Sequence, residues 1–282
     1  MLAGILALPS TAFAAPRQQC HFKYQPLQAG DRAIETFHLS LDFKTVLLQD
    51  GQVMGIIDQT VDRDEHSTVL RLEAARGQSA RAQISYDTSR QTVVHGRGGE
   101  ATSANRPVAG KTYVVARAGE KLLITDPTGS SPPEEEQAMV ARTMDALGKP
   151  NPFGVLLDGR TITFGEIVRL PADYTEKLLA GFDDSLAGMP VEVMLMGTEQ
   201  VDGKVCSLLH TPPPGAGDSH AKRAPIDGKF LVELDTCRVA VIELRGPISA
   251  TERRGAPGQE FDRRRKGKLQ VSVHIQHERA AR

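Results

Sequence analysis

The sequence predicts a mainly β protein, built as an antiparallel curved sheet or a β-sandwich with a short helical insertion in the middle. Apolar and polar residues alternate along several segments, most clearly at 37–43 and 269–275. Alternation with period two puts the apolar side chains on one face of a strand, and antiparallel sheets commonly have one buried and one solvated face. Asp-Gly dipeptides between apolar runs supply the turns of such a sheet.

Length and composition are those of an ordinary soluble globular protein. The chain has 282 residues, 40% hydrophobic and 24% charged, which suits one large all-β domain or two smaller ones. The formal net charge of −1 provides no field to attract nucleic acid, so we expect no nucleic-acid partner. Aromatic residues make up only 5% and tryptophan is absent. This argues against a carbohydrate-binding module, because sugars usually stack on flat rings.

Residues 1–14 predict a signal peptide. Residues 1–8 are apolar, and Ala12 and Ala14 place small side chains at the −3 and −1 positions, so cleavage is expected after Ala14. The apolar run is too short to cross a bilayer, which takes about 20 helical residues. The usual basic residues before the run are missing, which a start codon assigned too late would explain. A buried N-terminal helix is the alternative.

No membrane tether is expected after cleavage. Cys20 follows Arg17-Gln18-Gln19 and not the small apolar residues of a lipoprotein signal. No later segment is long and apolar enough to span a membrane. The sequence therefore predicts a protein that is free in the periplasm or outside the cell.

Residues 15–130 form an N-terminal β-rich segment. Asp50-Gly51 lies between apolar runs and predicts a hairpin, because both central residues of a type I′ turn need positive φ. Ala118-Gly119 predicts another hairpin, between strands at 112–116 and 121–125.

Residues 131–182 form a helical middle segment. Two prolines and then three glutamates, at 132–136, are typical of a helix start, where acids face the positive end of the helix dipole. Apolar residues then recur at helical spacing until Gly148 and Pro150 end the pattern. A second short helix is expected at 172–179.

Residues 183–282 form a C-terminal β-rich segment, which the sequence allows to join 15–130 in one domain. Asp202-Gly203 predicts a hairpin between strands at 193–196 and 205–209. The Pro-rich stretch 210–225 is expected to be a mobile loop.

A second mobile loop is expected at 249–268, where basic residues greatly outnumber the acids Glu252, Glu260 and Asp262. One hypothesis is docking to an anionic envelope surface, such as lipopolysaccharide or phospholipid headgroups; the alternative is a solvated loop. The basic residues are Arg253, Arg254, Arg263, Arg264, Arg265, Lys266 and Lys268.

The chain has three cysteines, and an oxidising compartment favours pairing two of them. We predict a disulfide between Cys206 and Cys237. If strands at 205–210 and 229–234 pair antiparallel, the start of the first lies beside the end of the second. The bond would close a loop of about thirty residues and stabilise by a few kcal/mol. Two independent buried thiols are the alternative, and no role is assigned to Cys20.

We predict no catalytic residue, cofactor or metal site. Ser219 and Lys222 match a Ser-x-x-Lys motif, but that chemistry needs a helix start and this stretch is rich in Pro and Gly. No Gly-x-Ser-x-Gly elbow is present. His274 and His277 would lie on opposite faces of a strand, so they are poorly placed to share a metal ion.

The order of these elements resembles uncharacterised secreted bacterial β-rich proteins. The motifs are Asp158-Gly159-Arg160, then Gly165-Glu166 and Leu170-Pro171, with residues 108–113 (VAGKTY) before them. This resemblance implies a fold and no activity. The chain is also similar in architecture to periplasmic lipoprotein carriers, in which helices line a curved sheet that holds acyl chains.

Three functions stay open. The favoured one is an exported soluble module that binds a partner or associates with the envelope without catalysis. The second is a periplasmic carrier of a lipid or other hydrophobic ligand, because the strand at 191–196 has apolar residues on both faces and needs cover on each. Cover by the protein's own helices is the alternative. A hydrolase with an unrecognised site is the third. The oligomeric state is left open.

Overall fold

The computed structural model describes residues 19–75, 78–96, 98–179, 190–213, 225–256 and 260–280. The predicted signal peptide at 1–14 and most of the predicted loop at 210–225 lie outside these residues. The helices are α1 (Glu134–Thr143), α2 (Pro152–Leu157) and α3 (Ala172–Leu179).

Fourteen strands make up most of the described chain. Their bounds are β1 (Gln19–His21), β2 (Arg32–Gln49), β3 (Gln52–Ala75), β4 (Gln78–His95), β5 (Ala101–Asn105), β6 (Thr112–Ala118), β7 (Lys121–Thr125), β8 (Thr161–Thr163), β9 (Ile167–Arg169), β10 (Glu192–Val201), β11 (Lys204–His210), β12 (Asp227–Glu233), β13 (Val239–Arg254) and β14 (Phe261–Glu278).

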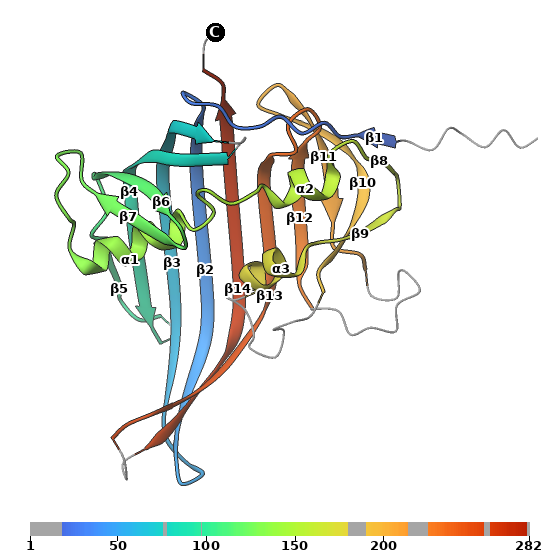
Figure 1. Ribbon diagram of the computed structural model, residues 1–282. Helices are drawn as coiled ribbons and strands as arrows, with labels where there is room; N and C mark the ends of the chain where they lie inside the picture. Colours follow the sequence, from blue (N-terminus) through green and yellow to red (C-terminus); the bar gives the residue numbers. More distant parts are fainter. Residues whose placement is uncertain are drawn as a thin grey trace, which may run out of the picture.

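One open, antiparallel 12-stranded sheet dominates the molecule (Figure 1). The strand order is β7-β6-β4-β3-β2-β14-β13-β12-β11-β10-β9, with β5 beside β4. β1 and β8 form a separate two-stranded sheet. The prediction of a mainly β protein is confirmed, and of the two predicted architectures the structure has the curved sheet. The N-terminal and C-terminal β-rich segments both contribute strands to this one sheet, because β2 pairs with β14 along its length.

The three predicted hairpins are present. β2 turns into β3 at Asp50 and Gly51, whose φ angles are 49° and 80°. β10 turns into β11 at Asp202 and Gly203, with φ angles of 49° and 75°. Gly119, with φ of 60°, joins β6 to β7. Asp and Gly tolerate positive φ better than most residues, which is why these dipeptides mark the turns.

The prediction of a mobile loop at 249–268 is wrong. Residues 249–254 belong to β13 and residues 261–268 to β14, and the two strands pair from Val241↔His274 to Arg254↔Phe261. The opposite edge of β14 pairs with β2 up to Asp262↔Leu48. Backbone hydrogen bonds on both edges hold this charged segment in the sheet, although few of its side chains favour a strand.

The helices lie on one face of the sheet (Figure 1). In α1, Glu136 accepts hydrogen bonds from Lys111 Nζ at 2.7 Å and Tyr113 Oη at 2.6 Å, which fastens the helix to β6. Asn151 caps α2 by accepting a hydrogen bond from the Phe153 amide at 3.1 Å. Its side-chain amide also donates to the Cys237 carbonyl at 2.8 Å, which ties α2 to the turn after β12.

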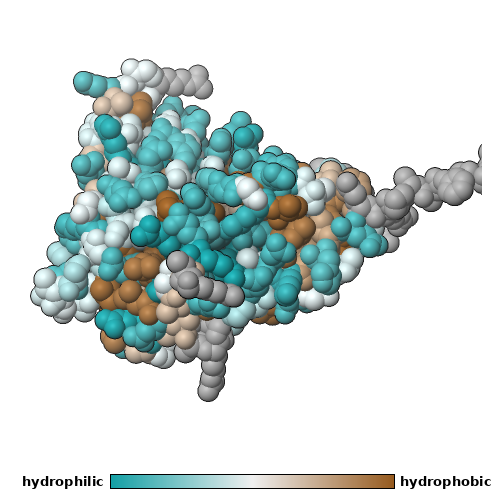
Figure 2. Space-filling view, turned by 90° about the horizontal axis from the view of Figure 1, so that it is seen from above, coloured by the Kyte–Doolittle hydropathy of each residue, from teal (hydrophilic) through white to brown (hydrophobic). Residues whose placement is uncertain are grey.

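Two apolar clusters fill the space under the helices. The larger contains Phe153 of α2, Phe230 of β12 and Leu195 of β10, all fully buried. The smaller packs Val140 and Met144 against Tyr113 and its neighbours on β4 and β6. In the view from above (Figure 2), hydrophilic residues cover most of the surface and hydrophobic residues gather in separate patches. The core therefore lies between the sheet and its helical cover.

Candidate ligand cavity

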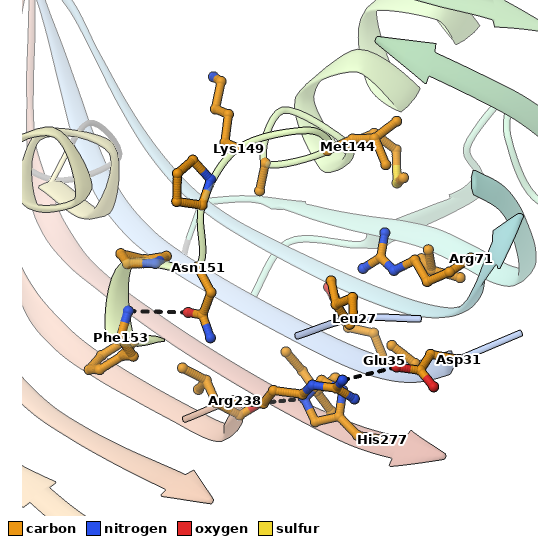
Figure 3. A pocket seen from close by; sticks show the side chains of 18 of the residues that line it. Leu27, Asp31, Glu35, Arg71, Met144, Lys149, Asn151, Phe153, Arg238 and His277 are labelled. Atoms are coloured by element: carbon orange, nitrogen blue, oxygen red, sulfur yellow. Dashed lines mark hydrogen bonds and ion pairs between the residues drawn. The ribbon is translucent and has the colours of Figure 1, made fainter. Parts of the chain in front are cut away.

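A cavity of about 320 Å³ remains between the two clusters. Its floor is the helix-facing side of β2, β3 and β14, and its roof is the connection from α1 to α2 (Figure 3). Most of the lining is apolar. The apolar lining includes Leu27, Ala33, Val69, Met144, Leu147 and Ile275.

The register explains the apolar floor. Ala33 of β2 pairs with Val69 of β3 on one side and with His277 of β14 on the other. Side chains two residues apart along a strand share a face, so Glu35 and Arg71 face the same way as Ala33 and Val69. Two ionisable groups, Glu35 and Arg71, thus lie on the same face of the sheet as the apolar floor residues Ala33 and Val69.

Arg71 is the cation of this floor, and its side chain extends toward the cavity in Figure 3. Among the described residues, no hydrogen bond or ion pair of the Arg71 guanidinium is observed. Burial, helped by the charge of Arg238, lowers the Arg71 pKa to about 10, against a weaker opposite effect of Asp31.

Glu35 of β2 is the carboxyl group of the floor, four residues after Asp31, which precedes the strand. Burial raises its pKa to about 7, and the negative charge of Glu65 adds to the rise, while Arg63 opposes it. Glu65 itself is buried and held by Arg63 at 2.7 Å and Arg106 at 2.9 Å. Glu35 therefore gains its proton near neutral pH.

Asp31 and Arg238 form a buried ion pair at one end of the cavity, with Nη2 and Oδ2 2.9 Å apart. Both side chains are at most 6% exposed. Beside Arg238, His277 Nε2 lies 2.9 Å from the Val239 carbonyl, so this nitrogen carries the proton that it donates. Burial lowers the His277 pKa. These partners hold the polar wall in a fixed arrangement.

The apolar floor continues beyond the cavity along β2 and β14. Leu39 and Leu41 pack against the larger apolar cluster, and Val271 lies opposite Leu39 in the register. Farther along, the paired hairpins β2–β3 and β13–β14 extend past the helical cover (Figure 1). They end in a tip that carries exposed apolar side chains.

The two cysteines that were predicted to form a disulfide are not among the residues that line the cavity. The predicted disulfide between Cys206 and Cys237 is not formed in the structure, where all three thiols are free and buried. β11 and β12 do pair as expected, with Cys206 opposite Glu233. However, Cys206 packs in a small cluster with Leu231 and Ala240, whereas Cys237 belongs to the largest cluster.

The two histidines of β14 point to different environments. His274 contacts Asp202 at 3.1 Å, and His277 lines the cavity. The Ser219 and Lys222 motif lies outside the described residues. Within the described ranges, no group of three or more His, Cys, Asp or Glu side chains is arranged to hold a metal ion. No helix among them is long and apolar enough to cross a membrane.

No known family model matches the chain, and no curated protein does either. Among solved structures, lipovitellin, described for its lipid–protein interactions, matches 92% of this chain and 26% of its own, with 7% identity and a TM-score of 0.36. The chain thus spans about a quarter of lipovitellin. A DUF1329 family protein from Desulfovibrio piger matches 85% of this chain and 83% of its own, with 12% identity and a TM-score of 0.17. At these scores neither likeness carries a function to this chain.

Proposed function

We propose that this chain is an exported, non-catalytic carrier that holds a hydrophobic ligand between its sheet and its helices. The observation that supports the proposal is the apolar cavity of about 320 Å³ under the α1–α2 connection. A volume of this size is at the lower end of small-molecule sites, which run from about 300 to 1,000 Å³. It suits one apolar chain better than a bulky lipid with several.

The unfilled volume under the helices favours a carrier over a plain structural module. Protein interiors are normally close-packed, with few voids larger than a water molecule. Here the floor residues Ala33 and Val69 and the roof residue Leu147 line an open volume. Lining side chains that lack neighbours lose dispersion contacts, and an apolar ligand would restore them.

Filling the cavity should abolish binding. We expect Ala33→Phe to weaken binding of the neutral apolar dye 1-N-phenylnaphthylamine by at least about tenfold, or about 1.4 kcal/mol, because the ring occupies the floor. Dye fluorescence measures the affinity, and native mass spectrometry of the purified protein reports a co-purifying ligand. Ala104→Phe, on the exposed strand β5, is the matched control. Equal dye binding by all three proteins would refute a carrier function of this cavity.

A second candidate function, attachment to an anionic membrane, is supported by the tip of the two long hairpins. Val53, Met54 and Ile56 at the start of β3 are each more than half exposed, and Ile57 is 43% exposed. The end of β13 and the start of β14 carry the basic residues beside them. Amphipathic surfaces of this kind bind interfaces through buried apolar area and attraction to anionic lipids.

Part of this basic charge is unneutralised. Arg254 and Arg265 both pair with Glu252, at 2.7 and 3.4 Å. In the described part of the chain, no ion pair is observed for Lys266 or Lys268, which project from the same face of β14. We therefore propose that the tip docks on a bilayer that contains anionic phospholipid, with the apolar side chains in the headgroup region.

Removing two of these charges should weaken docking. We expect Lys266→Ser with Lys268→Ser to reduce binding to phosphatidylglycerol vesicles roughly thirtyfold, because each lysine near an anionic surface contributes about 1 kcal/mol. Vesicle flotation at low salt measures the binding. The exposed pair Lys23→Ser with Lys121→Ser is the matched control, and pure phosphatidylcholine vesicles should bind poorly throughout. Equal flotation with both lipids would remove the electrostatic part of this proposal.

A further inference from the structure

Arg71 differs from the other basic residues around the cavity because, among the described residues, its side chain has no partner there. Arg238 is bonded to Asp31, Lys149 to Asp145 at 2.7 Å, and Arg32 to Glu278 at 3.7 Å. Within the part of the chain that the structure describes, the Arg71 guanidinium makes no ion pair. It is the cation that remains available to a ligand.

The nearest acid is already occupied. The Asp31 carboxylate accepts hydrogen bonds from Arg238 at 2.9 Å, from the Gln28 amide at 3.1 Å and from the Ala280 amide at 3.4 Å. The Arg71 backbone is also fixed, because its amide donates to the Asp31 carbonyl and its carbonyl accepts from the Gly30 amide. The guanidinium thus faces the cavity from a part of β3 whose backbone is fixed by hydrogen bonds.

A partly desolvated guanidinium without a counter-ion is unfavourable, and an anion entering the cavity would relieve this cost. The guanidinium fork matches carboxylate and phosphate oxygens in bidentate geometry. Beyond Arg71, the floor is apolar at Val69 and Ala33, and Met144 and Leu147 line the opposite side. The geometry therefore combines an anion contact with a slot for a chain.

We infer that the cavity binds a single-chain amphiphile whose oxyanion headgroup contacts Arg71 and whose apolar chain lies along the floor toward Glu35. This inference rests on the proposed carrier function and names its ligand class. Arg71 of β3 lies beside Asp31, because its amide bonds the Asp31 carbonyl. Glu35 is four residues farther along the neighbouring strand, or about 13 Å at 3.3 Å per residue. The chain therefore has room to run away from the headgroup.

The test compares three probes that share a twelve-carbon chain: dodecanoate, dodecyl phosphate and dodecanol. Each displaces 1-N-phenylnaphthylamine from the wild type, Arg71→Met, Arg71→Lys and the exposed control Arg90→Met. We expect the wild type and Arg90→Met to prefer the anions to dodecanol. Arg71→Met should lose roughly tenfold to a hundredfold in affinity for the preferred anion and keep its affinity for dodecanol. Arg71→Lys should recover part of the loss.

Several outcomes would overturn the inference. If the wild type binds dodecanol as tightly as both anions, the cavity is a carrier site without headgroup recognition. If Arg71→Met weakens all three probes equally, Arg71 has only a structural role. If none of the probes and no dye binds, the carrier function itself fails.

A stronger effect on dodecanoate than on dodecyl phosphate identifies a carboxylate headgroup, and the reverse identifies a phosphate. A thermal melt checks folding, and Arg71→Met should melt no lower than the wild type, because it removes a charge without a partner.

Discussion

Arg238→Met is expected to lower the free energy of unfolding by about 3–5 kcal/mol at neutral pH, because it leaves the Asp31 carboxylate buried without its cation. Asp31 and Arg238 are 207 positions apart in the sequence and are 4% and 6% exposed. Their contact joins the segment before β2 to the turn between β12 and β13. Urea denaturation at neutral pH measures the loss.

The pH dependence gives a second readout of the same pair. Burial alone would raise the Asp31 pKa, but hydrogen bonds from the Gln28 amide and from Arg238 outweigh it and hold the pKa below its usual value. A depressed carboxyl pKa contributes stability that is present above the unfolded-state value and is lost as the pH falls through the folded-state value. The wild type should therefore lose this stability in acid. In Arg238→Met the buried carboxyl lacks this cation and takes up its proton at a higher pH than in the wild type, so the deficit of the variant should shrink as the pH falls.

Asp31→Asn combined with Arg238→Met is the control. If the deficit comes from an uncompensated charge, the double variant should be more stable than Arg238→Met alone, because the remaining partner is neutral. If the double variant is the less stable of the two, with the two losses adding, the deficit comes from lost packing and not from the charge.

The strands and turns were predictable because their signals are local. The Asp50-Gly51 and Asp202-Gly203 turns need only the φ preferences of their own residues. The start of α1 follows from the acids of its first turn, whereas the helix ends at Thr143, five residues before Gly148. In contrast, the charged end of β13 and β14 is held by pairing with β2, more than 200 residues away along the chain, so a local pattern predicts a loop there.

The cavity could not be predicted from the sequence, because it depends on where the α1–α2 connection lies over the sheet. Its two charged floor residues, Glu35 and Arg71, can nevertheless be recognised from the alternation pattern of their strands. Glu35 has the same parity as Phe37 and Leu39, and Arg71 has the parity of Val69, so each is an ionisable residue on the apolar face of its strand. Asp31 and Arg238 left no such signal, because neither lies in a regular alternating run.

Glu35→Gln is expected to stabilise the protein at alkaline pH and to leave it unchanged in acid. Burial, reinforced by Glu65, raises the Glu35 pKa from 4.5 to about 7. A carboxyl group with a raised folded-state pKa binds more protons in the folded than in the unfolded protein between these values. The wild type therefore loses stability as the pH rises from about 4.5 to about 7, by up to about 3 kcal/mol, because each pKa unit corresponds to about 1.4 kcal/mol.

Glutamine resembles the protonated glutamate in size and hydrogen bonding but does not ionise. The free energy of unfolding of Glu35→Gln should therefore match that of the wild type near pH 4.5 and exceed it by a growing margin up to about pH 7. Above that pH the margin should stay constant. Urea denaturation of both proteins across this range measures it, and taking the difference cancels the titration of every other group. A margin that does not vary with pH would mean that Glu35 is ionised in the folded protein at every pH tested, and the floor of the cavity would then carry a permanent negative charge.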